Sequence, residues 1–457
     1  MTTDLTKGSP LKQIFLFSIP FLIGNLFQQF YNVADMVIVG RTLDPSAYAA
    51  VGSTGSLVWF ASGAIQALTT GFSVVTARYF GAKDEEGVKR SFAAAIKLSA
   101  LISILLALAC TLFARPLLEF MRTPADIMER AYGYIVWVFA GLVATALFNL
   151  LSNMIRALGD SKTPLYFLVV ACIINIILDF VLIALCGMDT DGAGLATVLA
   201  QLLSGLMCIV YIVKKQPRLH IAWRHFKTEW ALDGLLLHVG LPMAFLNMVL
   251  SVGSIVMQFV TNGMGTLYVS SQTTGAKIES FVTQPVLSFG SAVAVFAAQN
   301  YGAQRYDRVI DGGRKTMLMC VIWCGIASLI MIPFGRLFIP LLAGEVEQLV
   351  VDNAYRYIVI NTVLSFLLVP IVICKSILQS LGRTLWCMVS GFTEIVGRAG
   401  LSTVVILLMS GALLSTPLDV QTGYVIMCFC TPLAWLLGSL TVLGDYIAVM
   451  RKFKKLL

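Results

Sequence analysis

Charged residues are scarce in this sequence. Asp, Glu, Lys and Arg together make up 12% of the 457 residues, whereas a soluble domain contains about 25%. Apolar residue types reach 58%, above the roughly 45–50% of a soluble domain. A chain with so little charge has few residues suited to a water-exposed surface. Low charge is expected of a chain surrounded by hydrocarbon, because polar groups there cost several kcal/mol each. We therefore expect lipid to surround most of the chain.

Residues that often build enzyme and metal centres are also few. The three histidines, His220, His225 and His238, lie in or beside one central loop. The ten cysteines fall inside apolar stretches and form no CxxC pair, so they are expected to be small buried hydrophobes. No segment resembles a glycine-rich loop that cradles phosphate, which argues against ATP hydrolysis. We expect no cofactor, no resident metal and no enzymatic activity.

Long apolar stretches are abundant instead. A hydrocarbon core needs about 20 helical residues per crossing, so apolar stretches of at least about 18 residues predict transmembrane helices. The predicted spans are 14–40, 51–80, 91–113, 131–158, 164–186, 192–213, 234–263, 269–298, 314–335, 352–381, 384–410 and 418–450. The sequence therefore predicts an all-α polytopic membrane protein with about twelve transmembrane helices.

The distribution of basic residues predicts how the chain is oriented. If the N-terminus is cytoplasmic, the inner segments carry 22 Lys and Arg residues and the outer segments carry six. Cytoplasmic loops are enriched in these residues, so both termini are predicted to be cytoplasmic. The formal net charge of +8 is explained by this topology and by contact with anionic lipid, and a nucleic-acid partner is not needed.

Three landmarks recur in the two halves of the chain. Pro20 and Gly81 are 61 residues apart, and Pro242 and Gly302 are 60 apart. A Leu-Gly pair then follows in both halves, at Gly159 and at residue 382. We predict two parallel six-helix bundles related by a pseudo-twofold axis, an N-lobe of 1–223 and a C-lobe of 224–457. Paired bundles of this kind can rock about a shared site, which favours a secondary transporter.

Ionisable residues at membrane depth mark a candidate site in the first half. Asp35 lies deep in the first span, and Asn175 and Asp179 share a face of the fifth span because they are four residues apart. Thr197 of the sixth span can add an oxygen to the same place. Carboxylate, amide and hydroxyl oxygens together suit Na⁺ or a bound proton. The alternative is that both Asp residues are interfacial or structural hydrogen-bonding groups.

The second half carries a different set of charges. The position that corresponds to Asn175 is Arg398, and Glu394 precedes it by four residues, a spacing that predicts an intrahelical ion pair. Glu279 of the eighth span is a further candidate, either for a cationic substrate or for a pair with a neighbouring Lys. These three residues are candidates for polar groups in the transport cavity.

Four segments of the first half form a recognisable combination: residues 27–35, Arg156 to Pro164, Asn175 to Asp179, and Gly192 to Thr197. Each motif alone is weak, but together they resemble the multidrug and toxic compound extrusion (MATE) family, most closely its DinF-like branch. The likeness covers essentially the whole chain.

The resemblance implies two six-helix lobes in a V-shape and export of drugs, often cationic and amphipathic, against an H⁺ or Na⁺ gradient. It also implies that Asp35, Asn175, Asp179 and Thr197 form the ion-coupling site. Polar residues that line the same cavity match Gln28, Asn32 and Asn153. We expect a monomer that exports small-molecule drugs or metabolites across the cell (inner or plasma) membrane of a prokaryote.

Two other functions are compatible with parts of this pattern. A flippase for lipid-linked oligosaccharide belongs to the same broad superfamily, but such proteins commonly have more basic cavities than Asp35 and Asp179 would provide. A polytopic membrane enzyme would need a constellation of His or acidic residues at a membrane edge, and neither half contains one.

Overall fold

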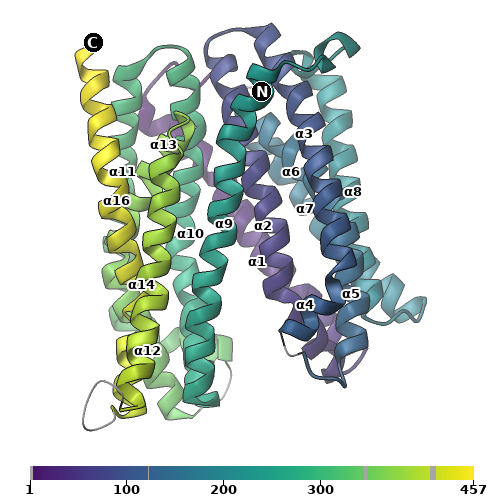
Figure 1. The fold of residues 1–457 in the computed structure, drawn as a ribbon, viewed down its shortest axis with the longest axis vertical. Helices are drawn as coiled ribbons and strands as arrows, with labels where there is room; N and C mark the ends of the chain where they lie inside the picture. The colour runs from purple at the N-terminus through teal and green to yellow at the C-terminus, as the bar shows by residue number, and fades with distance from the viewer. Residues whose placement is uncertain (1–3, 122, 344–346, 412–417) are drawn as a thin grey trace. The chain divides into compact units, whose positions relative to one another are not determined.

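The fold is built from helices throughout the described residues (Figure 1). The computed structural model describes residues 4–121, 123–343, 347–411 and 418–457, without the side chains of 30–37, 40, 41, 45, 342 and 343. Within these ranges, eleven helices are long and apolar enough to cross a membrane, and one bent pair of helices brings the total to twelve. The predicted all-α polytopic class is therefore confirmed.

Apolar side chains face outward along many of these helices. Helix α11 (Tyr306–Ala343) is the clearest case, since Leu329 and Leu341 are 75% and 79% exposed. Exposed leucines in such numbers would be unfavourable in water, whereas lipid tails are as apolar as Leu. This pattern is that of a protein with lipid around its helices.

The chain divides into two compact units. Unit 1 comprises Met1–Gly8, Leu16–Met248 and Ala298–Arg305, and unit 2 comprises Ser9–Phe15, Val249–Ala297 and Tyr306–Leu457. Three long helices are therefore shared. Helix α1 (Pro10–Thr42) passes from unit 2 into unit 1, and α9 (Trp230–Met264) passes from unit 1 into unit 2. Helix α10 (Thr266–Gly302) passes from unit 2 back into unit 1.

Unit 1 packs its helices around two apolar clusters. One cluster includes Phe72, Phe92 and Met154, and the other includes Ile65, Ile135 and Phe139. Besides parts of α1, α9 and α10, its elements are α2 (Pro45–Gly81), α3 (Glu85–Leu112), α4 (Ala114–Phe120), α5 (Met128–Ala140), α6 (Leu142–Ala157), α7 (Lys162–Asp179), the π-helical turn η1 (Phe180–Leu185), α8 (Thr190–Lys215), η2 (Pro217–Leu219) and η3 (Trp223–Phe226).

Glycine allows two close approaches in unit 1. A Cβ on Gly81 would lie 1.9 Å from the carbonyl oxygen of Gln299, and a Cβ on Gly302 would lie 1.9 Å from that of Arg78. The two repeat landmarks thus pack reciprocally, backbone against backbone. At Gly141 the fourth predicted span bends by 44° between α5 and α6, where a Cβ would lie 2.2 Å from Val198 of α8.

Unit 2 has a core of aromatic and sulfur-containing residues. Tyr357, Tyr424, Met427, Cys428 and Cys430 are all nearly inaccessible and lie in one cluster. The elements of this unit, besides parts of α1, α9 and α10, are α11, α12 (Gln348–Leu364), η4 (Ser365–Leu367), α13 (Leu368–Ser380), α14 (Leu385–Met409), α15 (Val420–Met427) and α16 (Cys430–Lys455).

Candidate functional site

Helix α7 brings Asn175 and Asp179 onto one buried face of unit 1. Both residues are 0% exposed. Asp179 is the last residue of α7, and the chain widens directly after it into the π-helical turn η1. Such wide turns interrupt the regular hydrogen-bond ladder and occur frequently at functional sites. The carboxylate therefore lies directly beside a break in the regular helical ladder.

The Asn175 side chain joins this carboxylate to the neighbouring helix. With the amide oriented to satisfy both neighbours, its nitrogen donates to Asp179 Oδ2 at 3.0 Å, and its oxygen accepts from the backbone N–H of Thr197 at 3.2 Å. The predicted grouping of Asn175, Asp179 and Thr197 is thus brought together in space. The group of Thr197 that meets Asn175 is its backbone N–H, which the sequence did not indicate.

Small residues at the start of α8 allow this helix to pack closely against α5 and against the loop that precedes it. A Cβ on Gly194 would lie 2.7 Å from the carbonyl oxygen of Tyr134 on α5. A Cβ on Gly192 would lie 2.9 Å from Cβ of Met188. The Gly192-to-Thr197 motif therefore packs the start of α8 against α5, and Thr197 of the same motif contacts Asn175 of α7.

Two predicted site residues fall on side chains that are not described. Asp35 and Asn32 lie on α1, and their side chains are outside the described residues. Gln28, one to two turns earlier on the same helix, is partly buried. The roles assigned to Asp35, Asn32 and Gln28 stay predictions.

Asn153 belongs to a polar chain between α6 and α2. Its Nδ2 donates to the hydroxyls of Thr69 and Thr70, each at 3.2 Å, and its Oδ1 accepts from Arg156 Nη1 at 3.2 Å. The Arg156 guanidinium in turn lies 4.9 Å from the centre of the Phe21 ring. These bonds hold Asn153 in a fixed orientation between the two helices.

Asp160 closes the turn that precedes α7. Its carboxylate accepts from the backbone N–H groups of Lys162 and Thr163, from the Thr163 hydroxyl at 2.7 Å and from Tyr211 at 2.7 Å. Gly159 just before it has φ of +86°, a conformation that favours glycine. The segment from Arg156 to Pro164 is thus a helix start tied to α8.

A cluster of charges that sequence reasoning missed lies at the ends of α2, α5 and α8. Arg130 donates to both oxygens of Asp44 at 2.8 Å, to Asp189 at 2.8 Å and to Ser46. Asp44 and Asp189 are the N-cap residues of α2 and α8. The hydrogen bonds from Arg130 hold the pKa of Asp44 well below its usual range, helped by Ser46 and the N–H of Ala47. In the sequence, Asp44 followed by Pro45 is the pattern of an N-cap with proline at the first helical position, and it could have pointed to the start of α2.

Unit 2 pairs its buried charges differently from the prediction. Glu394 of α14 meets Lys375 of α13 at 2.7 Å, and the two side chains are 6% and 14% exposed. The expected ion pair between Glu394 and Arg398 is therefore wrong. Spacing of four residues places two side chains on one face, but in a buried position the nearest opposite charge on a neighbouring helix is the stronger partner. Arg398 instead lies over Gly253 of α9, where a Cβ would be 3.5 Å from its Cδ.

The Glu279 carboxylate lies near Tyr357 and Arg398. The Tyr357 hydroxyl donates to Glu279 Oε2 at 3.4 Å, and the Arg398 guanidinium interacts with the same carboxylate electrostatically. Gly275, one turn before Glu279, allows this contact, because a Cβ there would lie 2.7 Å from the Tyr357 ring. Glu279 thus has a tyrosine of its own unit as its hydrogen-bond partner and an arginine near enough to act electrostatically, and the predicted lysine partner does not occur among the described contacts.

The chain is similar to a known family over most of its length. The sequence profile of the MatE family matches twice, over residues 20–181 and 242–404. A probable multidrug resistance protein of Bacillus subtilis (strain 168), YoeA, is 28% identical over 461 residues, covering 99% of this chain and 96% of the relative.

Solved structures share the fold at lower sequence identity. A MOP superfamily transporter from Pyrococcus furiosus, described as having a binding pocket of reverse polarity, superposes with a TM-score of 0.89 at 21% identity, covering 99% of both chains. A multidrug resistance MATE family transporter in an outward-facing conformation has a TM-score of 0.88 at 20% identity and covers 99% of both chains.

Proposed function

Because this chain belongs to the MatE family of membrane transporters, we propose that it is a secondary active exporter of small cationic or amphipathic compounds. An inward gradient of H⁺ or Na⁺ drives export by alternating access, and the protein catalyses no reaction. It acts as a monomer in the cell membrane of a prokaryote. The relative named as a probable multidrug resistance protein, matched over nearly its whole length, supports drugs as substrates.

The buried Asn175–Asp179 pair carries the coupling in this proposal, together with Asp35. With the Asn175 amide assigned by its hydrogen-bond partners, its nitrogen faces the carboxylate and its oxygen faces Thr197. A sodium ion takes oxygen ligands, as hard cations do, so it would need the opposite orientation of the amide. With the amide assigned in this way, we propose H⁺ as the coupling ion.

Proton binding can be linked to helix movement through the same amide. A proton on Asp179 Oδ2 turns that oxygen into a donor, so two donors would then face each other. The Asn175 amide must rotate to present its oxygen, and the contact between that oxygen and the Thr197 N–H is lost. The link between α7 and α8 is thus made in one protonation state and broken in the other, which is the differential affinity that coupling requires.

The orientation of the protein follows from its basic residues. With both termini and the loop that contains Lys214 to Lys227 in the cytoplasm, the basic residues obey the rule for inner segments. Protons bound from outside would then be released to the cytoplasm as substrate leaves.

Efflux of a fluorescent cation from vesicles tests the proposal, with a pH gradient and a sodium gradient imposed separately. Asp179→Asn and Asp35→Asn should keep expression and fold and should abolish gradient-driven efflux. Asp126→Asn is the matched control, because Asp126 is exposed in the loop between α4 and α5. Export should respond to the pH gradient alone.

Three outcomes would contradict parts of this proposal. If both Asp variants export at the wild-type rate under either gradient, the coupling site is wrong, and Glu279 or Glu394 becomes the candidate. If only a sodium gradient drives export, H⁺ is wrong. If the wild-type protein moves no cation but flips a lipid-linked oligosaccharide, the flippase replaces the exporter.

A further inference from the structure

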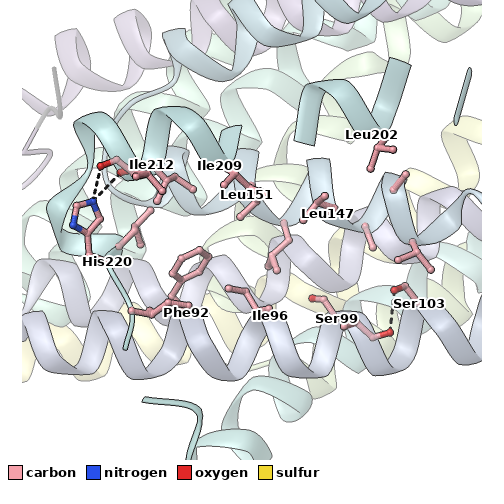
Figure 2. Close-up of a pocket in the computed structure, with 18 residues that line it drawn as sticks. Phe92, Ile96, Ser99, Ser103, Leu147, Leu151, Leu202, Ile209, Ile212 and His220 are labelled. Atoms are coloured by element: carbon pink, nitrogen blue, oxygen red, sulfur yellow. Dashed lines mark hydrogen bonds between the residues drawn. The ribbon is translucent and has the colours of Figure 1, made fainter. Parts of the chain in front are cut away.

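Unit 1 contains an apolar crevice that the transport site does not use. It has a volume of about 510 Å³ and lies between α3, α6 and α8, and residues 219–221 line one end of it. Small side chains create the space, among them Ala100 of α3 and Ala144 of α6. Figure 2 shows the side chains of Phe92, Ile96 and Leu147 along its walls.

The walls suit hydrocarbon and offer little to a cation. Besides backbone groups and His220, the polar lining consists of the hydroxyls of Ser99 and Ser103. Ser103 already donates to the carbonyl of Ala100 at 3.2 Å. No carboxylate occurs among the lining residues of the described crevice. Apolar cavities of this kind stay dry and bind apolar molecules.

The length of the crevice matches one leaflet. Along α3 it reaches from Phe92 to Ser103, and along α8 from Leu202 to Val213. Eleven residues of helix rise about 16 Å at 1.5 Å each. Half of a 30 Å hydrocarbon core is about 15 Å. Because the three helices are membrane spans, the crevice runs in the direction in which a lipid tail lies.

One end of the crevice has the composition of a headgroup layer. His220 sits at this end in Figure 2, where its Nε2 lies 3.2 Å and 3.0 Å from the carbonyl oxygens of Ile212 and Val213. Nearby in the chain, Trp223 and Trp230 are 90% and 86% exposed, as is typical of aromatic residues at a membrane interface.

Positive charge collects at the same end. Residues 214–229 contain five Lys and Arg residues and one Glu. Arg218 and Arg224 pair with Glu85 and Glu86 of α3. In the described contacts Lys214 and Lys215, both exposed in the last turn of α8, form no ion pair. Lys215 lines a neighbouring hollow with Glu85 and Arg218. Both lysines directly follow Val213, which lines the crevice. Their charges therefore lie within one helical turn of its end, where an anionic headgroup would sit.

From these features we infer that the crevice binds one acyl chain of an anionic membrane phospholipid, with the headgroup beside His220 and the Lys214–Lys215 pair. The lipid fills a void between three spans and ties α3 to α8. The inference does not depend on which solute unit 1 helps to export, because none of the residues involved belongs to the proposed coupling site.

Photolabelling of the full-length protein in nanodiscs tests this inference. The probe is phosphatidylglycerol with a photoreactive group near the end of one acyl chain, and labelled peptides are mapped by mass spectrometry. Labels should fall on the segments of α3, α6 and α8 that line the crevice. Ala100→Phe should fill the crevice and reduce this labelling about ten-fold, in line with the burial lost by a displaced chain.

A matched variant and a second blocking variant make the result interpretable. Ala109→Phe adds the same ring to the same helix at an exposed position outside the crevice, and it should label like the wild type. If Ala100→Phe fails to fold, Val143→Trp blocks the opposite wall, since Val143 is 38% exposed and lines the crevice. Equal labelling of the blocked and control variants would overturn the inference.

The headgroup is tested separately. Replacing Lys214 and Lys215 with Gln should weaken competition by unlabelled phosphatidylglycerol about five-fold per charge, whereas replacing Lys454 and Lys455 in the last turn of α16 should not. Equal competition by phosphatidylcholine would remove the anionic headgroup from the inference. Displacement by a cationic dye more readily than by lipid would make the crevice a drug site and overturn the lipid assignment.

Discussion

Corresponding positions of the two repeats carry side chains of different charge. Asn175 and Asp179 of unit 1 correspond, at the repeat offset of 223 residues, to Arg398 and Ser402 of unit 2. Helix α7 widens into a π-helical turn after Asp179, whereas α14 continues without interruption through Ser402 to Met409. The Ser402 hydroxyl bonds to the carbonyl of Arg398 on its own helix at 2.7 Å.

The difference shows two ways of keeping a carboxylate inside a membrane protein. In unit 2 the Glu394 carboxylate is neutralised by Lys375, an arrangement that stabilises only while both partners remain. In unit 1 Asp179 is joined to a neutral amide, which can accommodate more than one protonation state. We therefore expect structural behaviour from the charges of unit 2 and switching from those of unit 1.

Breaking the ion pair of unit 2 should have the largest effect on stability. Lys375→Met leaves Glu394 buried without its partner and should lower the free energy of unfolding by about 3–5 kcal/mol. Lys375→Met combined with Glu394→Met should recover most of that loss. Thermal unfolding in detergent measures both. The pairing is wrong if the two losses simply add, or if Arg398→Met destabilises strongly while Lys375→Met alone has little effect.

Removing the charge of unit 1 should affect transport and leave stability nearly unchanged. Asp179→Asn should reduce pH-driven efflux to the level of vesicles without the protein, because the site can no longer exchange a proton. Ser402→Ala, at the equivalent position of unit 2, should export at the wild-type rate. Initial rates of dye efflux at matched expression distinguish the two. Loss of efflux in both variants would show that the repeats share the switching role.

Displacing Tyr357 in unit 2 should have an intermediate effect. Gly275→Ala forces the buried Tyr357 ring away from α10 and should cost about 1–3 kcal/mol of stability. Gly400→Ala is the control, because a Cβ at that helical position meets nothing within 4 Å and should stabilise by up to about 1 kcal/mol. Melting temperatures that fall equally in both variants would count against the Tyr357–Glu279 contact.

The smallest expected effect concerns pH and the Asp44–Arg130 pair. Asp44→Asn keeps the cap of α2 and removes only the charge. The pKa of Asp44 is lower in the folded protein than in the unfolded chain, where it is near 4. The ionised carboxylate therefore stabilises the fold at pH values above about 4, and this stabilisation is lost as the pH falls through the lower folded pKa. The gap in melting temperature between wild type and variant should thus be constant near neutral pH and narrow below about pH 4.

Asp419 of unit 2 provides the comparison. It caps α15, and the N–H and hydroxyl of Thr422 lower its pKa, without the arginine that Asp44 has in its bonding set. Asp419→Asn should therefore show a smaller gap than Asp44→Asn at neutral pH. An equal gap would mean that the arginine adds nothing to the cap.

Patterns along a single helix were predictable from the sequence. Apolar runs long enough to cross a bilayer predicted the spans, because every backbone group in lipid must be satisfied within its own helix. The four-residue spacing of Asn175 and Asp179 predicted their common face, since helix geometry alone determines it. The motif that starts at Gly192 pointed to the segment of α8 that meets them.

Which charged residues pair with each other across different helices was decided only by the tertiary structure. Glu394 has Arg398 one turn away, yet its partner is Lys375, because α13 packs beside that face of α14. Arg130 joins two helix caps that are 145 residues apart in the chain, Asp44 and Asp189, and no local pattern connects them. Helix periodicity follows from the backbone and can be read in sequence order, whereas a buried charge takes the partner that packing brings within reach, and packing depends on the whole chain.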